Sequence, residues 1–333
     1  MMKKRTLALL LAGLLVLSLA FTGCGAPEPD APPADEAEPV DVDPDAFLIG
    51  ITQNNVGIDS YQTTYDRAFR EAVESRADVE GIILDAAGDV MRQINQVEDL
   101  MAQGVDVIII WPVDGTAIVP AVEKAQAEGF PVVITNSPID ESGYEFIVGF
   151  SGPDNIIQGR YAAEMMIDAL DGEGKVVEIM GLPGYVTAHQ RSDGFHEVIT
   201  DATGIEVLET QPGDWNREKS QQVMENFLLK YDEIDGVYAA DDNMAVGAIN
   251  AIKEAGRMDA IKVTSACMFG DGYDAMLRGE LHGSVEQSPI VDATNALEMA
   301  LAVARGEEVD FWYYFETPKV IVEEVENFEK PVF

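Results

Sequence analysis

The chain has 333 residues, enough for two α/β domains of ordinary size, and 47% of them are hydrophobic. Its 60 acidic and 21 basic residues give a net charge of −39. This charge argues against a nucleic-acid partner, because no basic stretch is present to neutralise phosphates, and it disfavours adsorption on anionic membranes. Any attachment to a membrane should therefore be covalent.

The N-terminal residues have the pattern of an export signal. Three basic residues at 3–5 precede an apolar run over 7–21, and small residues lead to Cys24. This pattern predicts a signal peptide over 1–23. The segment 21–25 resembles a bacterial lipobox, although Phe21 stands where leucine or valine is usual. The resemblance implies that Cys24 is lipidated and becomes the mature N-terminus; the alternative is an ordinary signal peptide with an incidental cysteine.

A Pro-rich acidic segment follows the predicted signal. Residues 25–45 contain six prolines, eight acids and no basic residue. Such a segment cannot bury enough apolar surface to fold, and its like charges extend it. We therefore expect a disordered tether over 24–46 between a lipid anchor and a folded body.

From residue 47 onward, apolar strands alternate with amphipathic helices. The clearest strand is 107–110, four β-branched residues without polar alternation, which predicts burial on both faces within a parallel sheet. A helix over 89–103 precedes it, and Pro112 with Asp114-Gly115 turns the chain into another helix over 116–128. Ligands bind beyond the carboxyl ends of parallel strands, so residues 111–114 should face a ligand.

The same alternation predicts the other elements. In the first half we expect strands over 47–52, 80–84, 131–135 and 146–150, and a helix from an N-cap at Ser60 to about 76. In the second half we expect helices over 154–170, 187–201, 216–230, 244–254, 270–278 and 289–305, and strands over 175–180, 205–211, 236–240, 261–266, 284–287 and 320–325. The strand before Asp241-Asp242-Asn243 repeats the arrangement at 107–114. The chain should therefore form two α/β lobes with facing edges.

Catalytic and cofactor motifs are missing where an α/β fold would carry them. The sequence has no Walker-type phosphate loop and no Gly-x-Gly-x-x-Gly after a strand. Residues 149–152 fall short of a nucleophile elbow, and the three histidines lack the spacing of metal ligands. Two cysteines are too few for a disulfide framework. We therefore expect a protein that is not an enzyme and that uses no cofactor or metal.

Three segments resemble the ribose-binding-like group of periplasmic binding proteins, the sugar-binding lipoproteins that feed ABC importers. They are residues 93–114, 190–195 and 240–249, and the resemblance extends from 47 to about 325. It implies a type I periplasmic binding protein, an α/β fold of two doubly wound parallel-sheet lobes joined by a three-crossing hinge. The crossings would lie near 151–152, 287–288 and 316–318. They would separate a first lobe (47–151 with 288–316) from a second lobe (152–287 with 317–333).

The resemblance also implies a ligand site between the lobes. Carried over position by position, its members are Asp59, Tyr61, Asn136, Arg191, Trp215, Asp241, Cys267 and Gln287. Arg191 would bond ligand hydroxyls, and Trp215 would stack on the apolar face of a sugar. Asp241 and Gln287 would add polar contacts.

Two positions depart from the family pattern. Asn136-Ser137 stands where the family has an Asp-Arg pair, and Cys267 stands where it has an aspartate. Both changes remove a charged group that would hydrogen-bond to vicinal hydroxyls of a sugar. We therefore expect a neutral sugar or polyol other than simple ribose.

Several of these residues also have a simpler interpretation. Arg191 could be a surface residue of its helix, Trp215 could pack at a helix start, and Asp241 could cap the next helix. Cys267 could be a rim thiol or a small buried residue. Trp111 is expected in the wall of the cleft rather than as a ligand contact.

The expected function is that of an exported solute receptor without catalytic activity. Its lobes would close around the ligand, and the closed form would dock on an ABC transporter permease at the outer face of the cytoplasmic membrane or in the periplasm. Two alternatives stay open. One is a receptor that reports to a membrane sensor kinase, and the other is a nucleoside-binding lipoprotein whose Trp111 and Trp215 sandwich a base.

Overall fold

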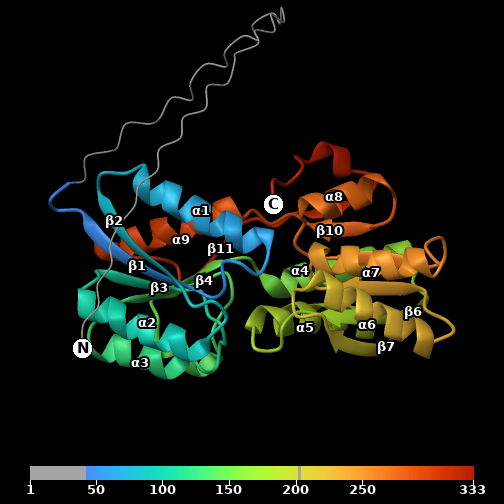
Figure 1. The fold of residues 1–333 in the computed structure, drawn as a ribbon, viewed down its shortest axis with the longest axis horizontal. Coiled ribbons are helices and arrows are strands. Elements are labelled where there is room, and N and C mark those ends of the chain that lie inside the picture. Colours follow the sequence, from blue (N-terminus) through green and yellow to red (C-terminus); the bar gives the residue numbers. More distant parts are fainter. Residues whose placement is uncertain (1–42, 202–203) are drawn as a thin grey trace, which may run out of the picture. The chain divides into compact units, whose positions relative to one another are not determined.

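Two six-stranded sheets organise this computed structural model, which describes residues 43–201 and 204–333 (Figure 1). The first sheet has the strand order β11-β5-β4-β3-β1-β2, and the second has the order β12-β10-β9-β8-β6-β7. The two orders correspond strand for strand. The predicted signal peptide and lipidation site lie outside the described residues, as does nearly all of the predicted tether.

The first sheet is parallel throughout. Its strands are β1 (Phe47–Gln53), β2 (Val79–Asp85), β3 (Val107–Ile110), β4 (Val132–Thr135), β5 (Gly149–Gly152) and β11 (Trp312–Tyr314). Helices α1 (Ser60–Glu74) and α9 (Pro289–Ala304) pack on one face, and α2 (Val90–Gln103) and α3 (Val119–Ala127) cover the other. All four residues of β3 are buried, as predicted, because helices cover both of its faces.

The second sheet has one antiparallel edge. Its strands are β6 (Gly174–Met180), β7 (Ile205–Pro212), β8 (Gly236–Ala239), β9 (Lys262–Ser265), β10 (Gly283–Val285) and β12 (Lys319–Ile321). Helices α4 (Asn155–Ala169) and α5 (Val186–Asp201) cover one face, and α6 (Arg217–Lys230) and α7 (Asp242–Glu254) cover the other. α8 (Gly270–Leu277) follows β9. β12 runs antiparallel to β10, so this sheet is not purely parallel as expected. The chain reaches β12 from the first sheet without the helical crossover that parallel pairing within one sheet needs.

Polar side chains fix the starts of six helices. In each case a side-chain oxygen of the residue before the helix accepts a backbone N–H from its first turn. The caps are Asp59, Asp89, Asp154, Asn216, Asp241 and Ser288. Because these helices follow strands, their capped ends lie at the carboxyl edges of the sheets.

Several boundaries differ from the expected ones. α3 begins at Val119 rather than at 116, because the Asp114 carboxylate accepts the N–H groups of Thr116 and Ala117 and holds a turn. The strand expected over 146–150 is β5, displaced to 149–152 by a 3₁₀ helix at Glu141–Phe146. The strand expected over 320–325 ends at Ile321, and Val325–Asn327 is a 3₁₀ helix. β11, which was not predicted, forms because it pairs with β5.

The chain passes between the sheets three times, at 153–154, 286–288 and 315–318. We call residues 43–152 with 289–314 the first lobe, and residues 155–285 with 319–333 the second lobe. Gly152, placed in the second lobe from sequence, is the last residue of β5 and pairs with Tyr314. It therefore belongs to the first lobe.

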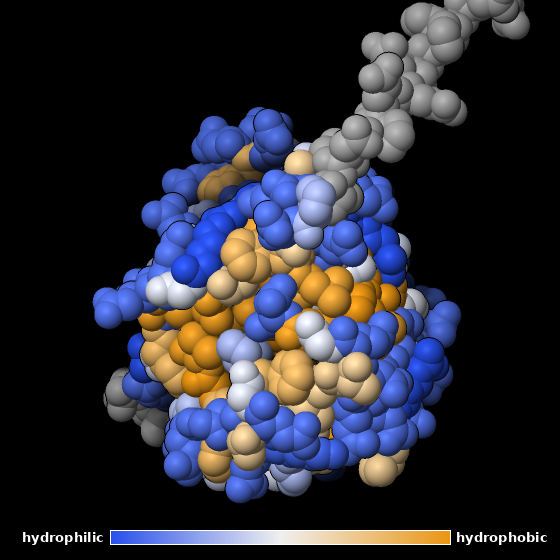
Figure 2. Space-filling view, turned by 90° about the vertical axis from the view of Figure 1, so that its left-hand side faces the viewer, coloured by the Kyte–Doolittle hydropathy of each residue, from blue (hydrophilic) through white to orange (hydrophobic). Residues whose placement is uncertain are grey.

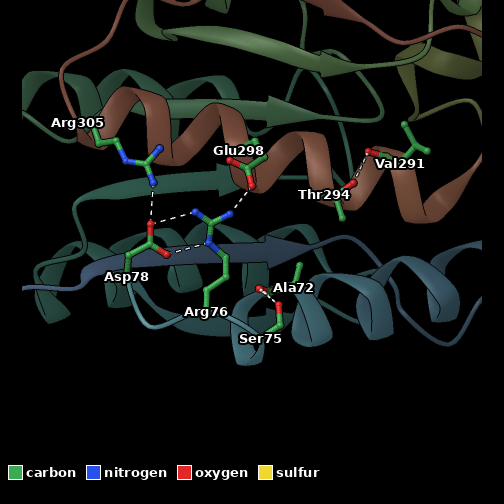
Figure 3. Close-up of polar contacts among 8 residues, drawn as sticks. All are labelled: Ala72, Ser75, Arg76, Asp78, Val291, Thr294, Glu298 and Arg305. Atoms are coloured by element: carbon green, nitrogen blue, oxygen red, sulfur yellow. Dashed lines mark hydrogen bonds and ion pairs between the residues drawn. The ribbon is translucent and has the colours of Figure 1, made fainter. Parts of the chain in front are cut away.

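Ion pairs tie α9 to the connection between α1 and β2 (Figure 3). Arg76 bonds Asp78 at 2.8 Å and also reaches Glu298 on α9. Arg305, which follows α9, donates to Asp78 at 2.7 Å. The bonds to Arg76 and Arg305 lower the pKa of Asp78 to about 2. The side chains are partly exposed and each pair contributes little alone, but together they help to hold a late helix on the first lobe.

The outer end of the first lobe carries a band of hydrophobic residues between polar ones (Figure 2). β2 is an edge strand of this sheet, and its residues 82–84 are partly exposed. Within the described ranges, no helix has the length and apolar character needed to cross a bilayer.

Candidate functional site

One cavity lies between the carboxyl edges of the two sheets. Its lining residues are Asp59, Tyr61, Gln62, Trp111, Asn136, Tyr185, Thr187, Arg191, Trp215, Asp241, Cys267, Phe269 and Gln287. They include all eight residues expected from the sequence. Twelve are buried and Asp59 is partly exposed. The protein therefore encloses this site rather than presenting it as an open groove.

The two lobes meet directly at the rim of the cavity. The Gly115 N–H donates to the Gly184 carbonyl at 3.2 Å, and the Thr187 N–H donates to Ser137 Oγ at 3.3 Å. A Cβ atom at Gly115 would lie 2.6 Å from a methyl of Val186, so this approach requires glycine. These contacts describe a closed arrangement of the lobes.

Arg191 is 4% exposed and is held on three sides. Its Nε donates to Gln158 at 2.9 Å, one Nη donates to the Ala240 carbonyl at 2.8 Å, and the other donates to Gln287 at 2.8 Å. A guanidinium has five N–H donors, so one remains on each Nη. The alternative of a surface residue is wrong, and three of the N–H groups of the guanidinium that we expected to bond ligand hydroxyls donate to the protein.

A hydrogen-bonded chain continues from Arg191 into the first lobe. Gln287 Nε2 donates to the Tyr61 hydroxyl at 2.7 Å, and this hydroxyl donates to Asp292 at 2.9 Å. Asn136 Nδ2 donates to the same Asp292 oxygen at 2.5 Å. Burial raises the pKa of Asp292 to about 7, against the effect of these two bonds. One polar network thus joins α5 of the second lobe to α9 of the first.

Asp292 and Gln158 do not line the cavity but hydrogen-bond to residues that do. Neither was predicted from the sequence. Asp292 does carry a signal, since it is an acid on the buried face of α9, one turn before Ala296. Such an acid needs a partner, because an unpaired buried carboxylate is costly. Gln158 carries no comparable signal, because glutamine is ordinary on a helix.

Two carboxylates line the cavity, and both cap helices. Asp59 accepts the Gln62 N–H at 2.8 Å, and Asp241 accepts the Met244 N–H at 2.7 Å. Burial raises the pKa of Asp59 to about 6 and that of Asp241 to about 7, while the bonds from the helix N–H groups act in the opposite direction. The capping alternative for Asp241 is therefore correct, and the same residue also lines the cavity.

Two indoles form aromatic walls. Trp215 has a left-handed φ of 58° and lies against Gly181, where a Cβ atom would be 2.1 Å from the ring. The Arg191 guanidinium lies 5.8 Å from its ring centroid. Trp111 meets Tyr61 edge-on at 6.2 Å. Neither indole N–H has a hydrogen-bond partner among the residues that the structure describes. Trp215 is thus both packed and cavity-lining, and each indole can donate to a ligand.

Asn136 and Cys267 share a strained backbone conformation. Their φ angles are 59° and 60°, in the left-handed region that few residues other than glycine and asparagine adopt. Such strain clusters at functional sites. Burial raises the pKa of the free Cys267 thiol, and no histidine lines the cavity, so this thiol lacks the activation of a catalytic nucleophile.

Five further residues line the cavity beside the expected eight. They are Gln62, Trp111, Tyr185, Thr187 and Phe269. Trp111 fits its expected place in the wall. Tyr185, Thr187 and Phe269 follow β6 and β9, so the carboxyl-edge rule that selected Trp111 could have found them.

The lining combines hydrogen-bond donors and acceptors with aromatic walls. Donors remain on Arg191 and on both indoles, and Gln62 Oε1 is a buried acceptor without a partner in residues 43–201 and 204–333. No group of three acidic, histidine or cysteine side chains suited to a metal ion occurs in the described part of the chain. This set of groups suits a compact ring that carries several hydroxyls.

Comparisons with known proteins agree with this chemistry. Residues 49–308 match the family described as periplasmic binding protein domain. The chain is 32% identical over 266 residues to the ribose import binding protein RbsB of Bacillus subtilis (strain 168), covering 79% of this chain and 83% of that protein. It is 30% identical over 295 residues to a xylitol-binding protein of Mycolicibacterium smegmatis, covering 88% and 79%.

A solved structure shares the arrangement of both lobes. It is an ABC transporter solute binding protein from Bacillus halodurans C-125 with bound myo-inositol. The TM-score is 0.80 at 29% identity, and the match covers 86% of this chain and 98% of that one.

Proposed function

The chain belongs to the periplasmic binding protein family, and we propose that it binds a small neutral sugar or polyol and delivers it to an ABC importer. Members of this family are solute receptors that work outside the cytoplasm, not enzymes. The proposal for this chain goes further, to a ligand class and to the residues that hold it.

The observation that carries the proposal is the composition of the closed cavity. Two indoles offer flat apolar faces, while Arg191, Asp241 and Gln62 offer donors and acceptors in the same cavity. Sugars and cyclic polyols combine apolar ring faces with hydroxyls that both donate and accept. The xylitol-binding relative and the myo-inositol complex support the same class.

We assign ligand contacts to the eight residues selected from the sequence and add Trp111. Trp215 and Trp111 would stack on the ring or donate to it, and Arg191 would donate its two free N–H groups. Asp241 would accept from a hydroxyl. With neither an Asp-Arg pair at 136–137 nor an acid at 267, simple ribose should bind weakly.

The test is calorimetry on the mature protein with ribose, galactose, xylitol, myo-inositol and adenosine. We expect binding of at least one sugar or polyol other than ribose, in the micromolar range or tighter. Tight ribose binding would overturn the specificity claim. Binding of adenosine alone would replace the sugar proposal with a nucleoside receptor.

Binding should involve closure of the two lobes about the three crossings at 153–154, 286–288 and 315–318. The ligand would meet one lobe first, and closure would then bury it and remove water. Small-angle scattering should show a smaller radius of gyration at ligand saturation. An identical scattering profile with and without saturating ligand would contradict closure.

A gene deletion can distinguish delivery of the ligand to a permease from signalling to a sensor kinase. Deleting the gene should abolish uptake of labelled ligand by cells. If uptake persists while ligand-dependent transcription is lost, the receptor serves a sensor kinase instead.

Membrane attachment is proposed to depend on Cys24, from the lipobox-like segment 21–25. Replacing Cys24 with alanine should release the protein from the membrane fraction. A Cys24→Ala protein that still fractionates with membranes would refute the anchor without affecting the ligand site.

A further inference from the structure

Residues 330–333 pack against the second lobe beside the cavity. The end of this segment is marked C in Figure 1. Lys330 pairs with Asp274 of α8 at 2.7 Å, and the Gly270 N–H donates to the Phe333 carbonyl at 2.7 Å. A Cβ atom at Gly270 would lie 2.8 Å from the Pro331 carbonyl oxygen. The segment therefore rests closely on the start of α8, and its attachment does not depend on the first lobe.

The ring of Phe333 reaches the opposite lobe. It meets Tyr61 edge-on, with centroids 5.6 Å apart and an interplanar angle of 88°. It also meets Phe269 of its own lobe at 5.4 Å and 65°. Tyr61 and Phe269 are themselves 6.4 Å apart, so the three rings form one cluster with members from both lobes.

Phe333 does not line the cavity, but both of its aromatic neighbours do. The hydroxyl of Tyr61 joins Gln287 to Asp292, so the orientation of this ring affects the polar network as well as the wall. Edge-on aromatic contacts are favourable and orientation-dependent. A ring carried by the second lobe therefore bears on a residue of the first lobe that the ligand site uses.

We propose that Phe333 is a positioning residue for closure, holding Tyr61 in its cavity-facing orientation when the lobes come together. The contact with Phe269 lies within one lobe and persists in an open form, whereas the contact with Tyr61 exists only on closure. Phe333 thus favours the closed state selectively. The proposal rests on the proposed function, because it assumes that ligand binding closes the lobes.

The experiment compares Phe333→Ala with Val332→Ala in the full mature chain. Val332 is the matched control, since it is adjacent and 75% exposed. The probe is myo-inositol, or another panel sugar or polyol if that binds more tightly. We expect Phe333→Ala to raise Kd about tenfold, mainly through faster dissociation, and Val332→Ala to leave Kd unchanged. Phe333→Tyr should restore binding because it keeps the ring.

A double-mutant cycle separates positioning from a general effect on the second lobe. In a Tyr61→Leu background, Phe333→Ala should change Kd by less than about threefold, because the contact between lobes is already gone. A full tenfold effect in that background would overturn the proposal. So would equal Kd values for wild type and Phe333→Ala.

The two proposals fail in different ways. A wild type that binds no panel member contradicts the sugar or polyol function. Phe333 is then judged by hydrogen exchange of the unliganded protein, in which the lobes adopt the closed arrangement for part of the time. Peptides over 59–66 should exchange faster in Phe333→Ala than in Val332→Ala, and equal exchange would overturn the positioning role.

Discussion

The two lobes share a strand order but present different chemistry to the cavity. The first lobe contributes Asp59, Gln62 and Asn136 beside Tyr61 and Trp111, and none of these is a cation. The second lobe contributes Arg191, the one cation among the lining residues, already bonded to Gln158 and the Ala240 carbonyl. The second lobe therefore holds a preorganised polar platform, and the first lobe supplies the surface that closes on it.

The loops after β4 and β9 share a backbone conformation but differ in the side chain that each brings to the site. Each has a non-glycine residue in the left-handed region, Asn136 in one and Cys267 in the other. The Asn136 amide bonds a buried carboxylate, whereas Cys267 makes no side-chain hydrogen bond within the described structure. The strand order thus determines which loops enter the site. The side chain at each left-handed position determines whether that loop forms a hydrogen bond there.

The largest expected effect is the loss of Arg191. Arg191→Ala should weaken ligand binding by one to two orders of magnitude, because hydrogen bonds to a charged group contribute about 1.5–3 kcal/mol. Arg160→Ala is the matched control, since Arg160 forms an exposed pair with Glu197 in the same lobe. Calorimetry on both variants measures the difference. Equal affinities of Arg191→Ala and Arg160→Ala would contradict the preorganised polar platform in the second lobe.

Asn136→Ala and Cys267→Ala compare the two loops directly. Asn136→Ala removes a partner of buried Asp292 and should lower the free energy of unfolding by about 1–3 kcal/mol. Cys267→Ala removes no hydrogen bond and should cost less than about 1 kcal/mol. Urea denaturation of the unliganded proteins measures both. Equal losses would show that the loops are interchangeable.

The pH dependence of affinity should come from one carboxyl in each lobe. Burial raises the pKa of Asp59 to about 6 and of Asp241 to about 7, so the closed form binds protons. For an uncharged ligand, affinity is therefore full below the ordinary carboxyl pKa and falls as pH rises through these values. Asp241→Asn should flatten the upper part of the curve, and Asp59→Asn the lower part. The exposed control Asp271→Asn should leave the curve unchanged; a flat wild-type curve would contradict the assignment.

The smallest expected effect concerns the two indole N–H groups. Trp111→Phe and Trp215→Phe keep an aromatic wall but remove a donor that has no partner in the described part of the chain. If each N–H meets a ligand hydroxyl, either change should raise Kd by about three- to tenfold. Calorimetry then shows which lobe donates to the ligand. An unchanged Kd in both variants would assign the indoles to packing alone.

Much of the fold could be predicted because local periodicity reports burial. The four β-branched residues of β3 predicted a strand covered on both faces, and they are fully buried. The site positions came from a resemblance to a family, and all eight line one cavity. β11 could not be predicted in this way. Its three residues become a strand only because β5 offers an open edge.

The sequence by itself determined the fold class, the alternation of elements and the edge where the site lies, because hydrophobic spacing acts over neighbouring residues. Only the tertiary structure decided how the site residues are held. Tyr61 and Asp292 are 231 positions apart, and Arg191 and Gln287 are 96 apart, so no local pattern could pair them. These partners are set by the packing of two lobes, which places a helix from late in the chain on the first lobe and a glutamine between the two.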